Sequence, residues 1–333
     1  MIELEERRTQ TKIKVADLKN RLTRAERIAG DKACVYATGS FGRGEASKHS
    51  DLDIFILGKD DPKLDKEGRR GSQLKRLDDI CIKAELIHAT REMDFPEFSG
   101  DGKFLVHYSV RDFTKELGSQ EDDFKNTFTA RLLLLLESIP LVGAVAYNEI
   151  VSNVLDAYWR DWEGHSAEFM PAFLANDILR LWRTFCVNYE ARTLRMPAEE
   201  KAKGKLRNYK LKHSRMLTCY SALLSLSATF SQKGTVSKDD ALLMIGRTPT
   251  QRLEALMQDR DLVEAHEALN NLLINYNLFL KRTDDTEENL LKIFGDPGSS
   301  KSYFDEAYRF GDIMAEAMSL IGSNARFHRL LIV

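Results

Sequence analysis

The chain has 333 residues, 43% of them hydrophobic and 30% charged, which is typical of a globular protein with a sizeable core. Its formal net charge of -2 excludes a chain that is basic overall, so a nucleic-acid surface would have to be a local patch. The four cysteines, Cys34, Cys81, Cys186 and Cys219, form no C-x-x-C pair, which argues against a structural zinc site and is typical of reduced thiols. The N-terminus has no signal-peptide core, and no apolar run is long enough to cross a bilayer. We therefore expect a cytoplasmic protein with no membrane partner.

Helix and strand signals alternate over residues 1–120 and predict a small domain built on a mixed sheet. Residues 2–29 carry a loose apolar face at helical spacing, and Gly30 ends that helix. The next predicted elements, in chain order, are a strand over 33–39, a glycine-rich turn, a strand over 51–57, a charged loop over 58–71, a helix over 72–93, a loop over 95–102 and a strand over 103–110.

Beyond about residue 120 the apolar residues recur at helical spacing and strand signals nearly vanish. The helix candidates cover residues 128–138, 146–162, 172–192, 205–227, 262–282 and 302–322. We therefore predict an α+β chain in which a small mixed-sheet domain over 1–120 is followed by an all-α accessory domain over 121–333.

The stretch ATGSFGRGEASKHSDLDIFIL, residues 37–57, contains the most informative pattern in the sequence. Side chains alternate between the two faces of a strand, so Asp51 and Asp53 point one way while Leu52 and Ile54 point the other. Two carboxylates on one face repel each other unless a cation lies between them. Oxygen ligands alone suit Mg²⁺ or Mn²⁺, which complete their coordination with water and substrate phosphates. The pair therefore predicts a metal site and a phosphate-bearing substrate.

The glycine-rich turn before these aspartates has the composition of a phosphate-binding loop. Gly39 follows a predicted strand, and Ser40 offers a hydroxyl and a backbone N–H group. A helix beginning near Phe41 would point its first N–H groups toward an anion, and further glycines allow close backbone approach. We expect this turn to hold a triphosphate while the aspartates hold the metal ions, which is the arrangement of two-metal phosphoryl or nucleotidyl transfer.

Gly39-Ser40, ten further residues and then Asp51-x-Asp53 resemble the signature of the DNA polymerase β-like nucleotidyltransferase superfamily. The longer form, G-S-x-G-R-G-E-x(5)-S-D-x-D, together with HYSVRDFTKEL over 107–117, is similar to the bacterial branch that includes the PII-protein uridylyltransferases. The resemblance covers roughly residues 30–115. It implies a nucleotidyltransferase domain in which Asp51 and Asp53 bind Mg²⁺ and Gly39 and Ser40 bind the β- and γ-phosphates, with Arg43 as a further phosphate contact.

The implied reaction moves a nucleoside monophosphate from a nucleoside triphosphate to a hydroxyl group, with release of pyrophosphate. The acceptor stays open between a protein, an RNA and a small molecule, and so does a homo-oligomer or a protein partner bound through the helical domain. Two alternatives are also open. One is a catalytically inactive nucleotide-sensing or partner-binding module on the same fold, and the other is a synthase of cyclic or linear oligonucleotide second messengers.

A third carboxylate is implied by the resemblance, because the family supplies one from a later strand to bind metal and accept the proton of the attacking hydroxyl. Residues 103–110 contain no acid. The nearest acids lie in the segment before that strand, and Glu97 and Asp101 are the two candidates for a catalytic role, with Asp94 also nearby.

Residues 201–215 contain seven Lys or Arg residues and no acid. On a helix, Lys205, Asn208, Lys212 and Arg215 form a stripe beside an apolar face, from which they could face a cleft. The resemblance adds that family members bind the triphosphate with basic residues of their helical domain, so Lys205, Lys212 and Arg215 are candidate phosphate ligands. His213 falls on the apolar face itself and is expected to be packed in the core rather than to act in RNA cleavage with Arg207.

Overall fold

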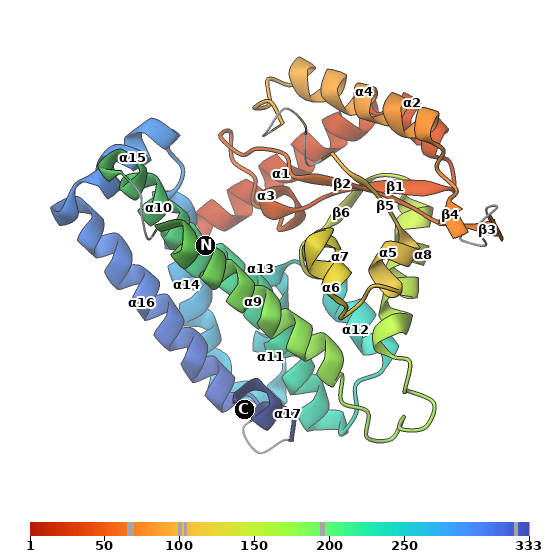
Figure 1. The fold of residues 1–333 in the computed structure, drawn as a ribbon. Helices are drawn as coiled ribbons and strands as arrows, with labels where there is room; N and C mark the ends of the chain where they lie inside the picture. The colour runs from red at the N-terminus through yellow and green to blue at the C-terminus, as the bar shows by residue number, and fades with distance from the viewer. Residues whose placement is uncertain (65–69, 99–101, 103–104, 194–196, 323–325, 333) are drawn as a thin grey trace. The chain divides into compact units, whose positions relative to one another are not determined.

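The computed structural model describes the chain except for residues 65–69, 99–101, 103–104, 194–196, 323–325 and 333 (Figure 1). Its contacts divide it into two compact units, one of residues 6–160 and one of residues 1–5 together with 161–333. Within the described residues, no helix combines the length and the apolar character that crossing a membrane requires.

The sheet of the first unit is four-stranded and mixed, in the order β5-β2-β1-β6. The central strand β1 (Ala33–Ala37) pairs antiparallel with both β2 (Ile54–Gly58) and β6 (Ile139–Val142), whereas β2 pairs parallel with β5 (His107–Ser109). Every residue of β1 is buried. The predicted mixed sheet is therefore confirmed, and β1 lies at its centre.

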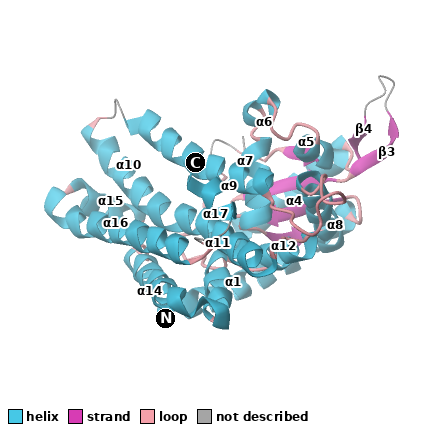
Figure 2. Ribbon diagram, turned by 90° about the horizontal axis from the view of Figure 1, so that it is seen from below, coloured by secondary structure: helices cyan, strands magenta, loops and turns pink. Residues whose placement is uncertain are grey.

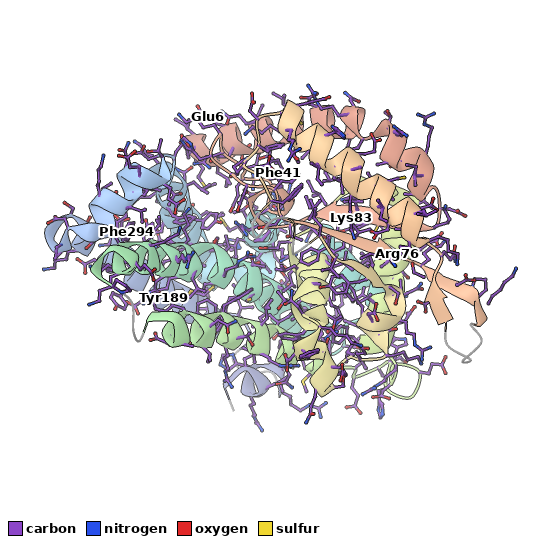
Figure 3. All side chains as sticks on the ribbon, turned by 45° about the horizontal axis from the view of Figure 1, so that its top comes forward. Glu6, Phe41, Arg76, Lys83, Tyr189 and Phe294 are labelled. Atoms are coloured by element: carbon purple, nitrogen blue, oxygen red, sulfur yellow. The ribbon has the colours of Figure 1, made fainter. Side chains whose placement is uncertain are left out.

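Eight helices accompany the strands described above, and the first of them begins in the residues assigned to the other unit. They are α1 (Ile2–Arg21), α2 (Thr23–Ala29), α3 (Gly39–Gly42), α4 (Arg76–Glu92), α5 (Val110–Thr114), α6 (Gln120–Phe124), α7 (Thr127–Leu136) and α8 (Ala144–Tyr158). Helices α2 and α4 pack against each other, and their apolar side chains join those of β1 and β2 in one core. Phe41 of α3 lies inside this unit, while Arg76 and Lys83 extend from α4 (Figure 3).

Three features of this unit differ from the sequence-based expectation. The first unit extends to Arg160 rather than to residue 120, because β6 completes the sheet and α7 and α8 flank it in sequence. The charged segment 58–71 contains β3 (Asp60–Leu64), which pairs with β4 (Arg70–Ser72) in a separate two-stranded hairpin (Figure 2). The helix predicted over 2–29 is two helices that meet at Leu22.

A fully buried ion pair joins α6 to α7. The guanidinium of Arg131 donates two hydrogen bonds to the carboxylate of Asp122, at 2.8 and 2.7 Å, and both side chains are 0% exposed. Arg131 also donates to the Tyr158 hydroxyl, and Asp122 accepts from Thr127 Oγ1 at 2.7 Å. Because the remaining polar atoms of the pair are hydrogen-bonded, the cost of burying two charges is offset here.

The free energy of unfolding should depend on pH through Asp122. Burial alone would raise the pKa of Asp122, but the hydrogen bonds and charge of Arg131, with Thr127, outweigh it and hold that pKa below its usual 3.8. The unfolded state therefore takes up a proton at a higher pH than the folded state does. The stabilisation should be complete above pH 3.8 and lost as the pH falls through the lower folded-state pKa. Urea unfolding of the native chain and of an Asp122→Asn variant across this pH range measures the difference in slope.

The second unit is helical throughout its described residues. Its elements are α9 (Ala172–Thr193), α10 (Ala198–Lys210), a π-helical turn over Leu211–Arg215, α11 (Met216–Lys233), α12 (Lys238–Ile245), α13 (Pro249–Met257), a 3₁₀ helix over Arg260–Ala265, α14 (His266–Arg282), α15 (Glu287–Gly295), α16 (Pro297–Leu320) and α17 (Arg326–Ile332). Tyr209 and Phe279 lie 5.5 Å apart between ring centroids in its core, and Phe294 packs 5.6 Å from Tyr209. The helical accessory region predicted from the sequence is thus confirmed in type, although α12, α13, α15 and α17 were not foreseen.

Candidate nucleotide site

The glycine turn and the two aspartates come together because β1 and β2 are antiparallel. Ala37 at the end of β1 is the register partner of Ile54 at the start of β2. One residue beyond that pair, the Thr38 N–H group donates to the Asp53 carbonyl oxygen at 2.8 Å. The turn that begins at Gly39 therefore starts next to the segment that carries Asp51 and Asp53.

The two aspartates lie on the exposed side of the segment that enters β2. Asp51 and Asp53 are exposed, whereas Leu52 and Ile54 between and beyond them are only 5% and 6% exposed. The alternation of exposed and buried side chains that is typical of a strand thus begins just before the first residue of β2. Both carboxylates are accessible to a ligand.

Gly39 lies close to the carboxylate of Asp53. Its φ of +64° is in the left-handed region, where glycine carries no steric cost. A Cβ atom on Gly39 would lie 2.9 Å from Oδ2 of Asp53. The missing side chain therefore leaves room directly beside the metal-ligand candidate.

Gly39→Ala should lower nucleotide transfer, because the added methyl group would displace the Asp53 carboxylate and strain the turn. Displacing a reacting group by about 1 Å can cost about a hundredfold in rate, and we expect a loss of that size. The measurement is the initial rate of transfer at saturating metal. Gly71→Ala is the matched control, since a Cβ there meets nothing within 4 Å. Equal rates for the two variants would contradict the expected role of Gly39.

Two backbone N–H groups of the turn are available to a ligand, and a third donates to a protein side chain. Among the described residues, the N–H groups of Ser40 and Phe41 have no hydrogen-bond acceptor. The Gly39 N–H group instead donates to Oε1 of Glu137 at 3.2 Å. Ser40 is half-buried, so its N–H group and hydroxyl are the parts of the turn available to an anion.

Arg43 lies behind the turn in a buried cluster of charges. It donates from Nε to Oε1 of Glu45 at 2.5 Å and from Nη1 to Oε2 of Glu137 at 2.8 Å, and its side chain is 8% exposed. This arrangement favours a role in bracing the turn over the phosphate contact expected from the sequence. Glu45 pairs with Arg43.

Asp51 and Asp53 form a donor set that fits Mg²⁺ or Mn²⁺. Two exposed carboxylates beside a glycine without a side chain leave space for an ion, water and phosphate oxygens, which is the coordination that Mg²⁺ usually has in enzymes. Over the part of the chain that is described, no group of three or more His, Cys, Asp or Glu residues is placed to hold an ion. Among the described residues, Asp51 and Asp53 are thus the candidate metal ligands.

Of the two further acids proposed as catalytic, Glu97 and Asp101, only Glu97 lies in the described part of the chain. Glu97 is 69% exposed at its side chain and accepts from Arg91 Nε at 2.9 Å, an arrangement typical of a surface ion pair. Asp101 lies outside the described residues. Asp94 adopts a positive φ of 53° in the turn after α4. A catalytic role for Glu97 or Asp101 stays a prediction.

The basic segment of the second unit runs along α10 into the π-helical turn. Lys205, Asn208, Lys212 and Arg215 are all half-buried, whereas Lys203, Arg207 and Lys210 are exposed. The Lys212 ammonium lies 4.2 Å from the centroid of the Tyr308 ring, and the Arg215 guanidinium lies 5.2 Å from that of Phe185. These cations are thus held against aromatic rings. Phosphate binding by Lys205, Lys212 and Arg215 remains a prediction.

His213 is packed in the core of the second unit, as the helical spacing predicted. It is 1% exposed, its ring stacks 4.6 Å from that of Phe279, and Nδ1 donates to the Tyr209 carbonyl oxygen at 2.9 Å. The hydrogen bond assigns the proton to Nδ1.

A pH-dependent loss of stability should follow from His213. Burial lowers the pKa of His213 from 6.5 to about 4, so between these values the unfolded state binds the proton and the folded state does not. The free energy of unfolding should therefore decrease as the pH falls from 6.5 toward 4, and His213→Phe should flatten that decrease. Denaturant unfolding of both proteins at pH values across this window is the measurement, and parallel curves would contradict the assignment.

Residues 18–117 match the family model of the nucleotidyltransferase domain. The match includes β1, the glycine turn, both aspartates, β2 and β5, and it ends before β6. No curated protein and no solved structure matches the chain. The match supports transfer of a nucleoside monophosphate as the reaction class of this unit.

Glu137, which accepts from Gly39 and Arg43, was missed by the sequence-based reasoning and lies outside the matched range. Glu137 directly follows the apolar run Leu132–Leu136. An acid directly after a leucine-rich run does not by itself predict burial, so the sequence held no clear signal for this residue.

Proposed function

We propose that this protein is a metal-dependent nucleotidyltransferase that moves a nucleoside monophosphate from a nucleoside triphosphate to a hydroxyl group. The observation that carries the proposal is the pair of exposed carboxylates, Asp51 and Asp53, beside a glycine whose Cβ would lie 2.9 Å from Asp53. The family match over residues 18–117 supports the same reaction class.

Each residue of the site has a role that follows from its position. Asp51 and Asp53 would hold Mg²⁺ or Mn²⁺, which neutralises charge on the triphosphate when it is bound. Ser40 would donate its N–H group and hydroxyl to the β- and γ-phosphates, and Gly39 would provide the space for them. With the triphosphate held in this way, its α-phosphorus would lie near the two carboxylates. The acceptor oxygen would approach the α-phosphorus there.

The reaction balances without a further reagent. The acceptor oxygen forms a bond to the α-phosphorus, and the bond from that phosphorus to the bridging oxygen of the β-phosphate breaks. Pyrophosphate leaves with the bonding electrons, and the hydroxyl proton passes to a base. Glu97 and Asp101 are the proposed candidates for that base, and water is the alternative acceptor of the proton.

The acceptor can be identified by the fate of the label. Each nucleoside triphosphate, labelled at the α-phosphorus, is incubated with the full chain, Mg²⁺ and a lysate fraction, and pyrophosphate release is followed. Label on a protein would identify a protein-modifying enzyme of the uridylyltransferase kind, and label on RNA or on a small molecule would identify those acceptors. A soluble product formed from nucleotides alone would identify a synthase of signalling oligonucleotides. No pyrophosphate release with any triphosphate would contradict a catalytic role.

A second candidate function is a nucleotide-sensing module that binds without turnover. The observation that favours it is the composition of the segment where a third carboxylate is expected, since residues 103–110 contain no Asp or Glu. Equilibrium dialysis with a labelled triphosphate separates the two candidates, because binding without pyrophosphate release indicates the sensor. The same experiment with Lys212→Ala and Arg215→Ala tests the phosphate contact proposed for the basic segment, which predicts weaker triphosphate binding.

A further inference from the structure

The turn at Gly39 is held from behind by four buried charged side chains. Arg7, Arg43, Glu45 and Glu137 are 5%, 7%, 3% and 2% exposed. Arg43 bridges the carboxylates of Glu45 and Glu137, and Arg7 Nη1 donates to the Glu45 carbonyl oxygen at 3.2 Å. Two positive and two negative charges balance. We call these four residues the brace.

Burying four charges is costly even when they are paired, and a buried ion pair is often no more stabilising than an apolar replacement. The brace is therefore poorly explained by stability alone. The position of the brace next to the turn suggests that it specifies a conformation, since a buried polar network with satisfied partners can fix one conformation among several. The conformation fixed here is that of the turn.

Glu137 contacts the turn at three points. Oε1 accepts from the Gly39 N–H group, Oε2 accepts from Arg43, and a Cβ on Gly42 would overlap the Glu137 carbonyl oxygen. Glu137 is separated from Gly39 by 98 residues and follows α7, two residues before β6. The pairing of Ala37 with Ile139 brings it there.

We propose that Glu137 is a positioning residue for the nucleotidyl-transfer site and acts through Gly39. Glu137 accepts the hydrogen bond of the Gly39 N–H group and thereby fixes the Gly39 backbone at its φ of +64°. The Gly39 backbone lies against the carboxylate of Asp53. Both carboxylate oxygens of Glu137 are engaged by protein donors. The inference rests on the proposed function, because it assigns Glu137 to the same metal and triphosphate site.

The test compares two carboxylate-to-amide changes that each face a buried arginine. Glu137→Gln leaves one carbonyl oxygen for two donors, so it loses either the Gly39 or the Arg43 hydrogen bond. Asp122→Asn makes the matching change in the Arg131 pair, which joins α6 to α7. Mn²⁺ binding in the presence of a non-hydrolysable triphosphate is measured by electron paramagnetic resonance, and folding is checked by thermal unfolding.

We expect Glu137→Gln to weaken Mn²⁺ binding by at least about tenfold, which is the usual loss when the residue that orients a metal ligand is changed. Asp122→Asn should lower the unfolding temperature and leave Mn²⁺ affinity within about twofold of the native value, because its pair links α6 to α7. If either amide variant fails to fold, Arg43→Lys replaces Glu137→Gln, and Tyr158→Phe replaces Asp122→Asn. Hydrogen exchange of the Gly39 amide, which needs no nucleotide, should be faster in Glu137→Gln than in the native chain.

The outcomes separate the inference from the proposed function. The positioning role would be overturned if the native chain binds Mn²⁺ and Glu137→Gln binds it equally well. It would also be overturned if Glu137→Gln and Asp122→Asn lose the same amount of Mn²⁺ affinity. Either result leaves the proposed function standing. Absence of Mn²⁺ and triphosphate binding to the native chain would overturn the proposed function and the inference with it.

Discussion

Replacing Asp51 and Asp53 together by alanine should lower the rate of nucleotide transfer by at least about a thousandfold, or roughly 4 kcal/mol of transition-state stabilisation. Both side chains lie on the exposed side of the segment that enters β2, and they are the two carboxylates proposed as metal ligands. Their removal would leave the proposed metal site without both of these ligands. The measurement is the initial rate of pyrophosphate release with Mg²⁺, the triphosphate and the lysate fraction that supplies the acceptor.

A control with the same change in charge separates loss of the site from a general electrostatic effect. Asp17 and Glu92 are surface acids that both contact Arg21, at 3.1 and 2.7 Å. Alanine at both positions also removes two negative charges but should leave the rate within about twofold, since exposed ion pairs contribute little. A double variant of Asp51 and Asp53 that keeps native activity would remove these residues from the mechanism.

Removing one partner of the buried Asp122–Arg131 pair should have the largest effect on stability. Asp122→Ala leaves the Arg131 guanidinium, which is 0% exposed at its side chain, without its carboxylate. An uncompensated buried charge typically costs about 3–5 kcal/mol. We expect a decrease of that size in the free energy of unfolding, measured with urea at neutral pH.

The double replacement Asp122→Leu with Arg131→Met distinguishes the cost of an isolated charge from the value of the pair. Because an apolar pair of similar volume needs no compensation, the double variant should recover most of the loss seen in Asp122→Ala. If the single change costs less than about 1 kcal/mol, water or a neighbouring group must compensate Arg131, and the pair is not needed for folding.

Much of the local structure could be predicted because it depends on neighbours in sequence. The buried run Ala33–Ala37 and the apolar residues from Ile54 onward have strand patterns, and the helical stripes of the second unit were detected by their period. β6 was missed because IPLV is short, contains a proline and follows a leucine-rich helix. Its strand character comes from pairing with β1, a long-range contact that propensity cannot show.

The same distinction applies to the site. Asp51, Asp53, Gly39 and Ser40 lie within one short segment, so their spacing alone indicated a metal and phosphate site. The part played by Glu137 could not be predicted, since it depends on the register of β6 against β1. Arg43 lies in the recognised motif, but its burial between Glu45 and Glu137 appears only in three dimensions.

Calorimetric titration of the full chain with a non-hydrolysable α,β-methylene nucleoside triphosphate is the most direct test of the site. It should be done with and without Mg²⁺, for the native chain and for the variant with alanine at positions 51 and 53. Binding to the native chain should require Mg²⁺ and should be lost in the variant, because the proposal assigns the metal for the triphosphate to these two carboxylates. Equal binding by both proteins, or native binding that is indifferent to Mg²⁺, would contradict a metal-dependent site at Asp51 and Asp53.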